Sequence, residues 1–122
     1  MPHFSCDCLF IKSWPLSYSL SGWYVRLLKG GHQGSHIHPS GWLSGVVYLK
    51  TVNDTNSPEG ALELSLHGYS LPIIDNVHPK KLFKPKQGDI VFFPSSLFHR
   101  TIPFREDTER CVIAFDLYPG KT

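Results

Sequence analysis

Cysteine, methionine and long apolar runs are all scarce in this chain. Its 122 residues include three cysteines, Cys6, Cys8 and Cys111, and one methionine. This odd, sparse set is no disulfide framework, so a reducing cytoplasmic setting is expected, and a thiolate metal site at Cys6 and Cys8 lacks a downstream partner pair. No apolar run approaches the ~20 residues of a membrane span, and residues 1–10 lack the pattern of a secretion signal. The sequence therefore predicts no membrane partner.

A large excess of one charge is also absent. Twelve lysines and arginines face ten aspartates and glutamates, which gives a formal net charge of +2. Such a balance lacks the electrostatic footprint of a nucleic-acid-binding protein. The length suits one domain with a modest core. We expect a single domain over residues 1–122, with a partly irregular segment over 1–21 and a core over 22–118.

No stretch keeps a helical period over three turns. Instead, ten glycines and ten prolines separate short runs rich in β-branched and aromatic residues, which is typical of an all-β domain. We expect strands over residues 23–28, 32–38, 42–49, 61–66, 89–93, 97–102 and 109–118. Residues 69–82 are expected to be irregular. Seven or eight short strands around one core favour a jelly roll, with an antiparallel sandwich of the immunoglobulin type as the alternative.

Histidine offers the metal-binding chemistry that cysteine does not. His36 and His38 alternate, so both side chains point the same way if the chain is extended there. His99 follows a predicted buried strand far along the chain. Two donors from one strand and a third from a distant one would form a three-histidine seat with open positions, and neutral imidazole binds iron, zinc, copper and nickel. The alternatives are exposed turn histidines and a satisfied core histidine at position 99.

The last predicted strand carries an arginine suited to binding an anion. Alternation puts Arg110 on a face shared with Val112, Ala114 and Asp116. The opposite face, with Cys111, Ile113 and Phe115, is expected to be core. An inward guanidinium needs an anionic partner, and its planar fork suits a carboxylate. The alternative is a surface ion pair with Asp107 or Glu109, which would contribute little stability.

Tyrosines on two other predicted strands are further candidates for the same cavity. Tyr48 shares a face with Ser44, and its hydroxyl could assist the arginine in binding a carboxylate. The alternative is core packing with one polar tip. Tyr24 and Arg26 share a face of the first strand and are expected to line the cavity as well. The remaining histidines, His32, His67 and His78, are interpreted as loop residues.

Five stretches of the chain together resemble a known family. They cover residues 22–27, 36–49, 88–99, 101–104 and 109–116. This combination resembles 2-oxoglutarate/Fe(II)-dependent oxygenases with a double-stranded β-helix, a cupin-like jelly roll, over roughly residues 22 to 118. The resemblance implies that His36 is the first iron ligand and His99 the distal one. It also implies that Arg110, assisted by Tyr48, grips the far carboxylate of 2-oxoglutarate.

The same resemblance implies an enzyme that uses Fe(II), 2-oxoglutarate and molecular oxygen to hydroxylate a C–H bond. One position departs from the broader pattern, because the residue two after the first histidine is usually a carboxylate and here is His38. A third imidazole leaves the centre one unit more positive and also suits zinc. Three-histidine iron sites do occur in cupin-type dioxygenases. A second register, with His38 as the first ligand and Ser40 in the acid position, is an alternative.

Two other functions remain open on the sequence. A cupin-like metalloenzyme that uses no 2-oxo acid predicts metal at the histidines with Arg110 on the surface. A non-catalytic jelly-roll module that binds a sugar or peptide predicts no metal, with Trp23 and Trp42 lining a shallow groove. The short chain leaves little material for a lid. That favours a partner subunit, a homodimer, or an exposed substrate such as a protein side chain. The expected substrate is a small molecule or a protein side chain.

Overall fold

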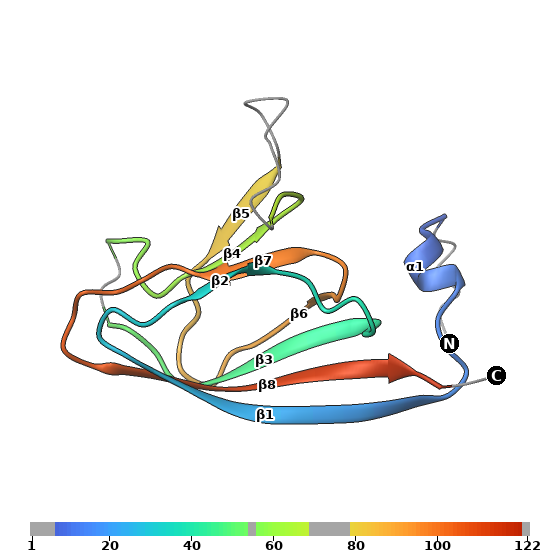
Figure 1. The fold of residues 1–122 in the computed structure, drawn as a ribbon, viewed down its shortest axis with the longest axis horizontal. Coiled ribbons are helices and arrows are strands. Elements are labelled where there is room, and N and C mark those ends of the chain that lie inside the picture. Colours follow the sequence, from blue (N-terminus) through green and yellow to red (C-terminus); the bar gives the residue numbers. More distant parts are fainter. Residues whose placement is uncertain (1–6, 54–55, 69–78, 121–122) are drawn as a thin grey trace.

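The computed structural model describes residues 7–53, 56–68 and 79–120. Two four-stranded antiparallel sheets face each other in this part of the chain (Figure 1). The major sheet runs β1 (Tyr18–Leu28), β8 (Glu109–Pro119), β3 (Leu43–Lys50) and β6 (Ile90–Pro94). The minor sheet runs β2 (Gln33–His36), β7 (Phe98–Thr101), β4 (Leu62–Ser65) and β5 (Lys80–Phe83). Strand partners are therefore distant in sequence, and the prediction of an all-β jelly roll is confirmed.

The core lies between the two sheets. Its buried cluster consists of Val46, Tyr48, Leu62, Phe93 and Val112, which come from both sheets. The β-branched and aromatic residues of β3 and β6 suit this pleated, covered surface. The chain enters β6 through Gly88, whose φ of 90° favours glycine, and the Gly88 N–H donates to the carbonyl of Tyr48 at 2.8 Å. This hydrogen bond joins the turn before β6 to β3, and so helps to fix the register of these two strands.

The outer face of the major sheet is apolar and exposed. Register places Tyr24 beside Ile113, and Ile113 beside Val47 of β3. Ile113 is 40% exposed, so the prediction that it belongs to the core is wrong. The inward face of β8 is the one that carries Arg110 and Val112, which are 2% exposed each. Both faces of β8 are rich in apolar residues, so hydrophobicity alone did not identify the inner one.

Two element boundaries differ from the sequence expectation. β1 begins at Tyr18, inside the segment expected to be irregular, because it pairs with β8 as far as Pro119. β5 also lies where no strand was expected, and all four of its residues are exposed. An edge strand with a lysine pair has no apolar alternation to reveal it. The remaining part of the expected irregular stretch, residues 69–78, lies outside the described residues, as do Cys6 and His78.

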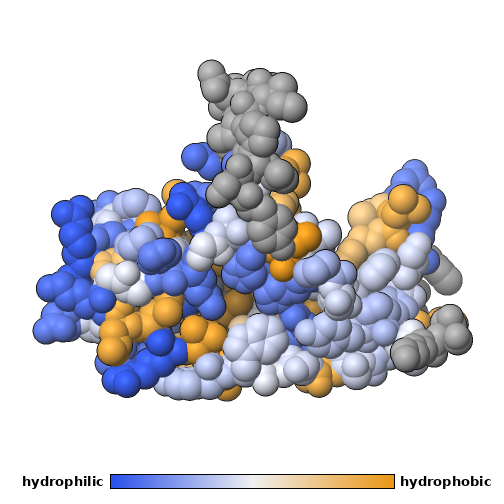
Figure 2. All heavy atoms as spheres, viewed as in Figure 1, coloured by the Kyte–Doolittle hydropathy of each residue, from blue (hydrophilic) through white to orange (hydrophobic). Residues whose placement is uncertain are grey.

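The helix α1 (Leu9–Lys12) is a single turn beside the open end of the roll (Figure 1). Phe10 stacks on Trp42, with ring centroids 5.3 Å apart and an interplanar angle of 9°. Leu9 and Ile11 are exposed, and apolar atoms gather on this turn at the right of Figure 2. Among the described residues, no helix has the length and hydropathy needed to cross a bilayer.

Candidate metal centre

Three histidine rings meet at one end of the space between the sheets. His36 ends β2 directly opposite His99 of β7, and His38 lies in the turn that follows β2. The ring centroids are 4.1 Å apart for His36 and His99, 4.9 Å for His38 and His99, and 5.1 Å for His36 and His38. One ligand nitrogen from each ring lies within 4.8 Å of the others. The structure thus brings together the three histidines that the sequence singled out.

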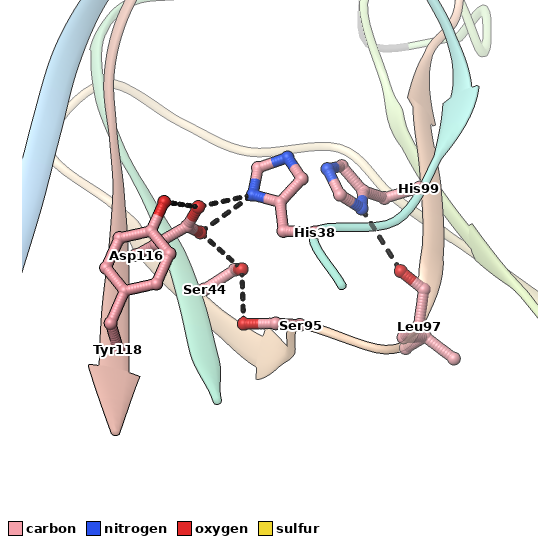
Figure 3. Close-up of polar contacts among 7 residues, drawn as sticks. All are labelled: His38, Ser44, Ser95, Leu97, His99, Asp116 and Tyr118. Carbon is pink, nitrogen blue, oxygen red and sulfur yellow. Dashed lines mark hydrogen bonds and ion pairs between the residues drawn. The ribbon is translucent and has the colours of Figure 1, made fainter. Parts of the chain in front are cut away.

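Each of the three rings has a hydrogen-bond acceptor at Nδ1. His36 Nδ1 donates to the Gly34 carbonyl at 2.6 Å, and His99 Nδ1 donates to the Leu97 carbonyl at 3.1 Å. His38 Nδ1 contacts both carboxylate oxygens of Asp116, at 2.6 and 2.8 Å (Figure 3). A proton held at Nδ1 leaves the lone pair of a neutral imidazole at Nε2. The hydrogen bonds therefore select the tautomer in which Nε2 is free to bind a cation.

Burial keeps His99 in the neutral form. Its side chain sits between the sheets with 7% of its surface exposed. Desolvation lowers the pKa of His99 to about 4, although the Leu97 carbonyl opposes this shift. The imidazole is therefore unprotonated near neutral pH, which is the form in which histidine binds metals.

Arg110 and Tyr48 lie buried in the interior with unsatisfied polar atoms. Arg110 is 2% exposed, and its Nε and Nη1 atoms have no hydrogen-bond partner among the described residues. The Tyr48 hydroxyl is likewise without a partner there. The guanidinium carbon lies 5.2 Å from the centroid of the Tyr48 ring. Burial lowers the pKa of Arg110 and raises the pKa of Tyr48. The interaction between the two groups opposes both shifts, although their atoms are not aligned for a hydrogen bond.

A single cavity joins the arginine to the histidines. Its lining includes His36, His38, His99, Arg110, Trp23 and Ser44. The alternative of a surface ion pair for Arg110 is therefore wrong. Glu109 instead forms an ion pair with Arg26 on the outer face of the major sheet. A buried guanidinium with free donors, in the same cavity as three imidazoles, is the arrangement expected for binding an anion next to a cation.

Three predicted cavity residues behave differently. Tyr48 lies against Arg110, with the guanidinium carbon 5.2 Å from its ring centroid, but it is not part of the cavity lining. Tyr24 is 59% exposed on the outer face of β1, so the prediction that it lines the cavity with Arg26 is wrong. Trp23, one residue earlier, is the inward side chain, and its ring centroid lies 5.7 Å from that of His38. Ser44 does line the cavity, but its hydroxyl donates to Asp116 at 2.6 Å.

Asp116 is a site residue for which the sequence patterns predicted no role. This aspartate is 2% exposed on β8 of the major sheet, whereas His38 lies in the turn after β2 of the minor sheet. The sequence did hold a signal for this role, since Asp116 is an acid on the same face as Arg110 of an otherwise apolar strand. A carboxylate buried on such a face needs a polar partner. Ser40, the acid position of the second register, is exposed and does not line the cavity. The register that starts at His36 therefore agrees better with the geometry.

Comparison with known structures places the fold among iron-dependent oxygenases. An oxidoreductase of the 2OG-Fe(II) oxygenase family from Burkholderia pseudomallei is 20% identical, with a TM-score of 0.63 over 83% of this chain and 43% of its own. A Pseudomonas putida prolyl-4-hydroxylase is 17% identical, with a TM-score of 0.62 over 83% of this chain and 53% of its own. HygX from Streptomyces hygroscopicus, solved with iron bound, is 16% identical, with a TM-score of 0.64 over 84% and 58%.

The chain thus spans between 43% and 58% of the length of these three solved structures. At such low identity the likeness establishes the fold alone. A search of curated proteins found no match. Residues 21–116 match the sequence family described as "Putative 2OG-Fe(II) oxygenase", which covers most of the chain and every residue of the cavity named above. The chain therefore belongs to the 2OG-Fe(II) oxygenase family.

Proposed function

We propose that this chain is an Fe(II)- and 2-oxoglutarate-dependent oxygenase that hydroxylates its substrate, and that residues 1–122 act as one domain. The observation that supports this most directly is the buried Arg110 with unpartnered donors in the cavity of the three histidines. A buried guanidinium without an anion is costly, so the cavity is built for a ligand that supplies one. A 2-oxo dicarboxylate has a 2-oxo acid group at one end, which can chelate a metal at the histidines. At its other end it has a carboxylate, which can bind Arg110.

The histidine end fits a divalent cation. His36, His38 and His99 each have an oxygen acceptor beside Nδ1, and one ligand nitrogen from each ring lies within 4.8 Å of the others. Three protein donors leave coordination positions of an octahedral iron open for other ligands. When bound, Fe(II) and 2-oxoglutarate supply the oxidation of an unactivated C–H bond by molecular oxygen. The protein supplies ligands, orientation and a largely apolar wall.

The arginine end fits a carboxylate. The two unpartnered nitrogens of Arg110, Nε and Nη1, can each donate a charge-assisted hydrogen bond to an anionic ligand such as a carboxylate. The Tyr48 hydroxyl, also unpartnered and 0% exposed, can donate a further hydrogen bond. Burial excludes water that would otherwise compete for these donors. We assign Arg110 and Tyr48 to the far carboxylate of the cosubstrate.

The two alternative functions fit the geometry less well. A cupin-like metalloenzyme without a 2-oxo acid predicts Arg110 on the surface, whereas only 2% of it is exposed. A non-catalytic module predicts Trp23 and Trp42 together in a shallow groove. Trp42 instead stacks on Phe10 and is not part of the cavity lining, while Trp23 lies against His38. The oxygenase is the function that uses the arginine and the histidines together.

Spectroscopy of the anaerobic protein tests this proposal. We expect Fe(II) followed by 2-oxoglutarate to produce a weak visible charge-transfer band, because the 2-oxo acid chelates the metal. Arg110→Ala is expected to abolish the band at the same cosubstrate concentration. The matched control is Arg105→Ala, which removes a fully solvated arginine. A wild-type protein that binds Fe(II) but gives no band would support the cupin-like alternative, and one that binds no metal would support the non-catalytic module.

The substrate that we propose is an exposed group such as a protein side chain. A shallow, open groove meets the cavity at Trp23 and His38, and its lining adds Ile37, Pro39, Ser40, Asp116 and Tyr118. Such a surface offers apolar and hydroxyl contacts to an extended chain and does not enclose a small molecule. Turnover on a peptide library, read by a mass increase of one oxygen, tests this choice against small acceptors.

We also propose that the outer face of the major sheet is covered by a second copy of this chain. The exposed side chains of this face include Leu20, Tyr24, Ile90, Phe92 and Ile113, between 40% and 67% exposed. These residues extend from the edge strand β1 across β8 to the opposite edge strand β6, and a stable interface buries ~800 Å² on each partner. Two such sheets can pack face to face at about 10 Å.

Sedimentation of the full chain tests the dimer. Phe92→Glu should convert a dimer to a monomer, because it places a charge among the apolar side chains of this face. Leu82→Glu, the same change on an exposed residue of β5, should leave the dimer intact. A wild-type chain that is monomeric at every concentration measured would refute the second copy as the occupant.

A further inference from the structure

The carboxylate of Asp116 is buried directly behind one of the three histidines. Asp116 is 2% exposed, and His38 Nδ1 lies 2.8 Å from Oδ1 and 2.6 Å from Oδ2 (Figure 3). The pair spans 78 positions of sequence and joins β8 to the turn after β2. Because the ring nitrogen that faces the carboxylate is Nδ1, the Nε2 edge faces away from it.

The other partners of this carboxylate are neutral hydroxyl groups. Ser44 Oγ donates to Oδ1 at 2.6 Å, and the Tyr118 hydroxyl donates to Oδ2 at 3.2 Å. Ser44 is itself held by Ser95, with the two Oγ atoms 2.8 Å apart. Over residues 7–53, 56–68 and 79–120, no lysine or arginine forms an ion pair with Asp116. The negative charge is therefore fixed in place by hydroxyls and is directed at His38.

A buried carboxylate without a cationic partner is expensive in free energy. Its position becomes favourable if a cation lies on the far side of the imidazole ring. The expected pattern of the broader superfamily has a carboxylate ligand at position 38, and a histidine in its place leaves the centre one negative charge short. Asp116 supplies one negative charge, and only the imidazole ring of His38 separates it from the expected metal position.

We propose that Asp116 is the positioning and charge-balancing residue of the metal centre. It holds His38 with Nε2 turned toward His36 and His99, and it makes that nitrogen a stronger donor. A carboxylate that accepts the N–H of a metal-binding histidine has both effects in general. The proposal rests on the proposed function, because it requires a cation at the three histidines.

Asp116→Asn in the full chain is the decisive variant. Asparagine keeps the size of the side chain and one acceptor oxygen, but it removes the charge and replaces the other acceptor with a donor. With Co(II) as the probe, in competition with a chromophoric chelator, we expect the affinity to fall about 10–100-fold. Asp107→Asn, the same change at an exposed aspartate, should bind Co(II) as wild type does.

A spectroscopic measurement separates this role from a structural one. In the anaerobic Fe(II) and 2-oxoglutarate complex, loss of the negative charge leaves the metal less electron-rich. The charge-transfer band of Asp116→Asn should therefore move to shorter wavelength than that of wild type. A change that only loosened the fold would weaken the band without moving it in this direction.

Three outcomes would overturn the proposal. The first is a folded Asp116→Asn protein with wild-type Co(II) affinity and band position, which would leave the proposed function standing. The second applies if that variant does not fold. Ser44→Ala then replaces it. We expect this variant to lose Co(II) affinity several-fold, because the carboxylate of Asp116 is less firmly held. A Co(II) affinity equal to that of wild type refutes the proposal. The third is a wild-type chain that binds no Co(II), which removes the metal site and this inference with it.

Discussion

The two ends of the cavity differ in how completely the protein satisfies its own polar groups. At the histidine end, the Nδ1 atoms of His36, His38 and His99 all have acceptors between 2.6 and 3.1 Å away. At the arginine end, the Nε and Nη1 atoms of Arg110 and the Tyr48 hydroxyl are buried without a partner among the described residues. Both ends are built from strands of the same roll.

This difference indicates which parts of the site folding completes. The histidine end is pre-organised, since every ring is oriented before a ligand arrives. At the arginine end, the desolvation of Arg110 is unfavourable in free energy, and a bound anion would compensate for it. The protein thus forgoes stability at one end of the cavity to gain affinity for an anionic ligand. Four measurements would break or sharpen this contrast.

The largest effect is expected from His99→Ala. Removal of the most buried of the three imidazoles should abolish stoichiometric Fe(II) binding and weaken Co(II) binding by more than about a hundredfold, beyond the loss typical of a residue behind a ligand. Metal analysis of the purified protein and chelator competition measure this. His32→Ala, at an exposed histidine outside the seat, is the control. Tight, stoichiometric iron in His99→Ala would show that the ligand set is wrong.

Arg110→Met should separate the two ends. Affinity for 2-oxoglutarate is expected to fall about a hundredfold or more, because two charge-assisted hydrogen bonds are lost, while Co(II) binding stays near wild type. The ligand-free protein should become more stable by about 1–3 kcal/mol, since an unsatisfied buried group is removed. Denaturation by urea and titration of the charge-transfer band give the two values. A variant that is less stable than wild type would refute the idea that the desolvation of Arg110 is unfavourable.

The pH dependence of the metal-free protein probes the histidine end. The pKa of His99 is lowered to about 4 in the folded chain from the ordinary value of 6.5, so the unfolded chain binds more protons between these two values. The stability that His99 contributes is thus complete above pH 6.5 and is lost as the pH falls toward 4, by about 2 kcal/mol between pH 7 and pH 5. Urea denaturation of wild type and His99→Gln measures it. An equal pH dependence in the variant would contradict the assignment.

The smallest effect is expected from Tyr48→Phe. If the Tyr48 hydroxyl assists Arg110, affinity for 2-oxoglutarate should fall about fivefold, the value of one neutral hydrogen bond. The ligand-free protein should be as stable as wild type or slightly more so, because this hydroxyl has no partner to lose. Tyr24→Phe, on the exposed outer face, should change neither quantity. Unchanged affinity in Tyr48→Phe would limit the role of Tyr48 to packing.

Much of this arrangement could be predicted from local patterns. Period-two alternation located most strands, and the His36 and His38 pair together with His99 marked the seat before any contact was known. The same alternation put Arg110 and Asp116 on one face of β8. These predictions succeeded because a strand fixes side-chain direction within a few residues.

What failed depended on pairing between distant strands. The contact between His38 and Asp116 spans 78 positions, and no spacing rule links them. Alternation gives two faces but does not say which one turns inward when both are apolar, and this misplaced Tyr24 and Ile113. The β5 edge strand, with Lys80 and Lys81, had no apolar pattern to detect.

The order of the strands along the chain has a consequence for biosynthesis. β8 follows the other strands that the structure describes, it lies between β1 and β3, and it carries both Arg110 and Asp116. A nascent polypeptide whose β8 is still inside the ribosome therefore has its histidines but lacks the groups that orient His38 and receive an anion. A complete site therefore requires that β8 has left the ribosome and paired with β1 and β3.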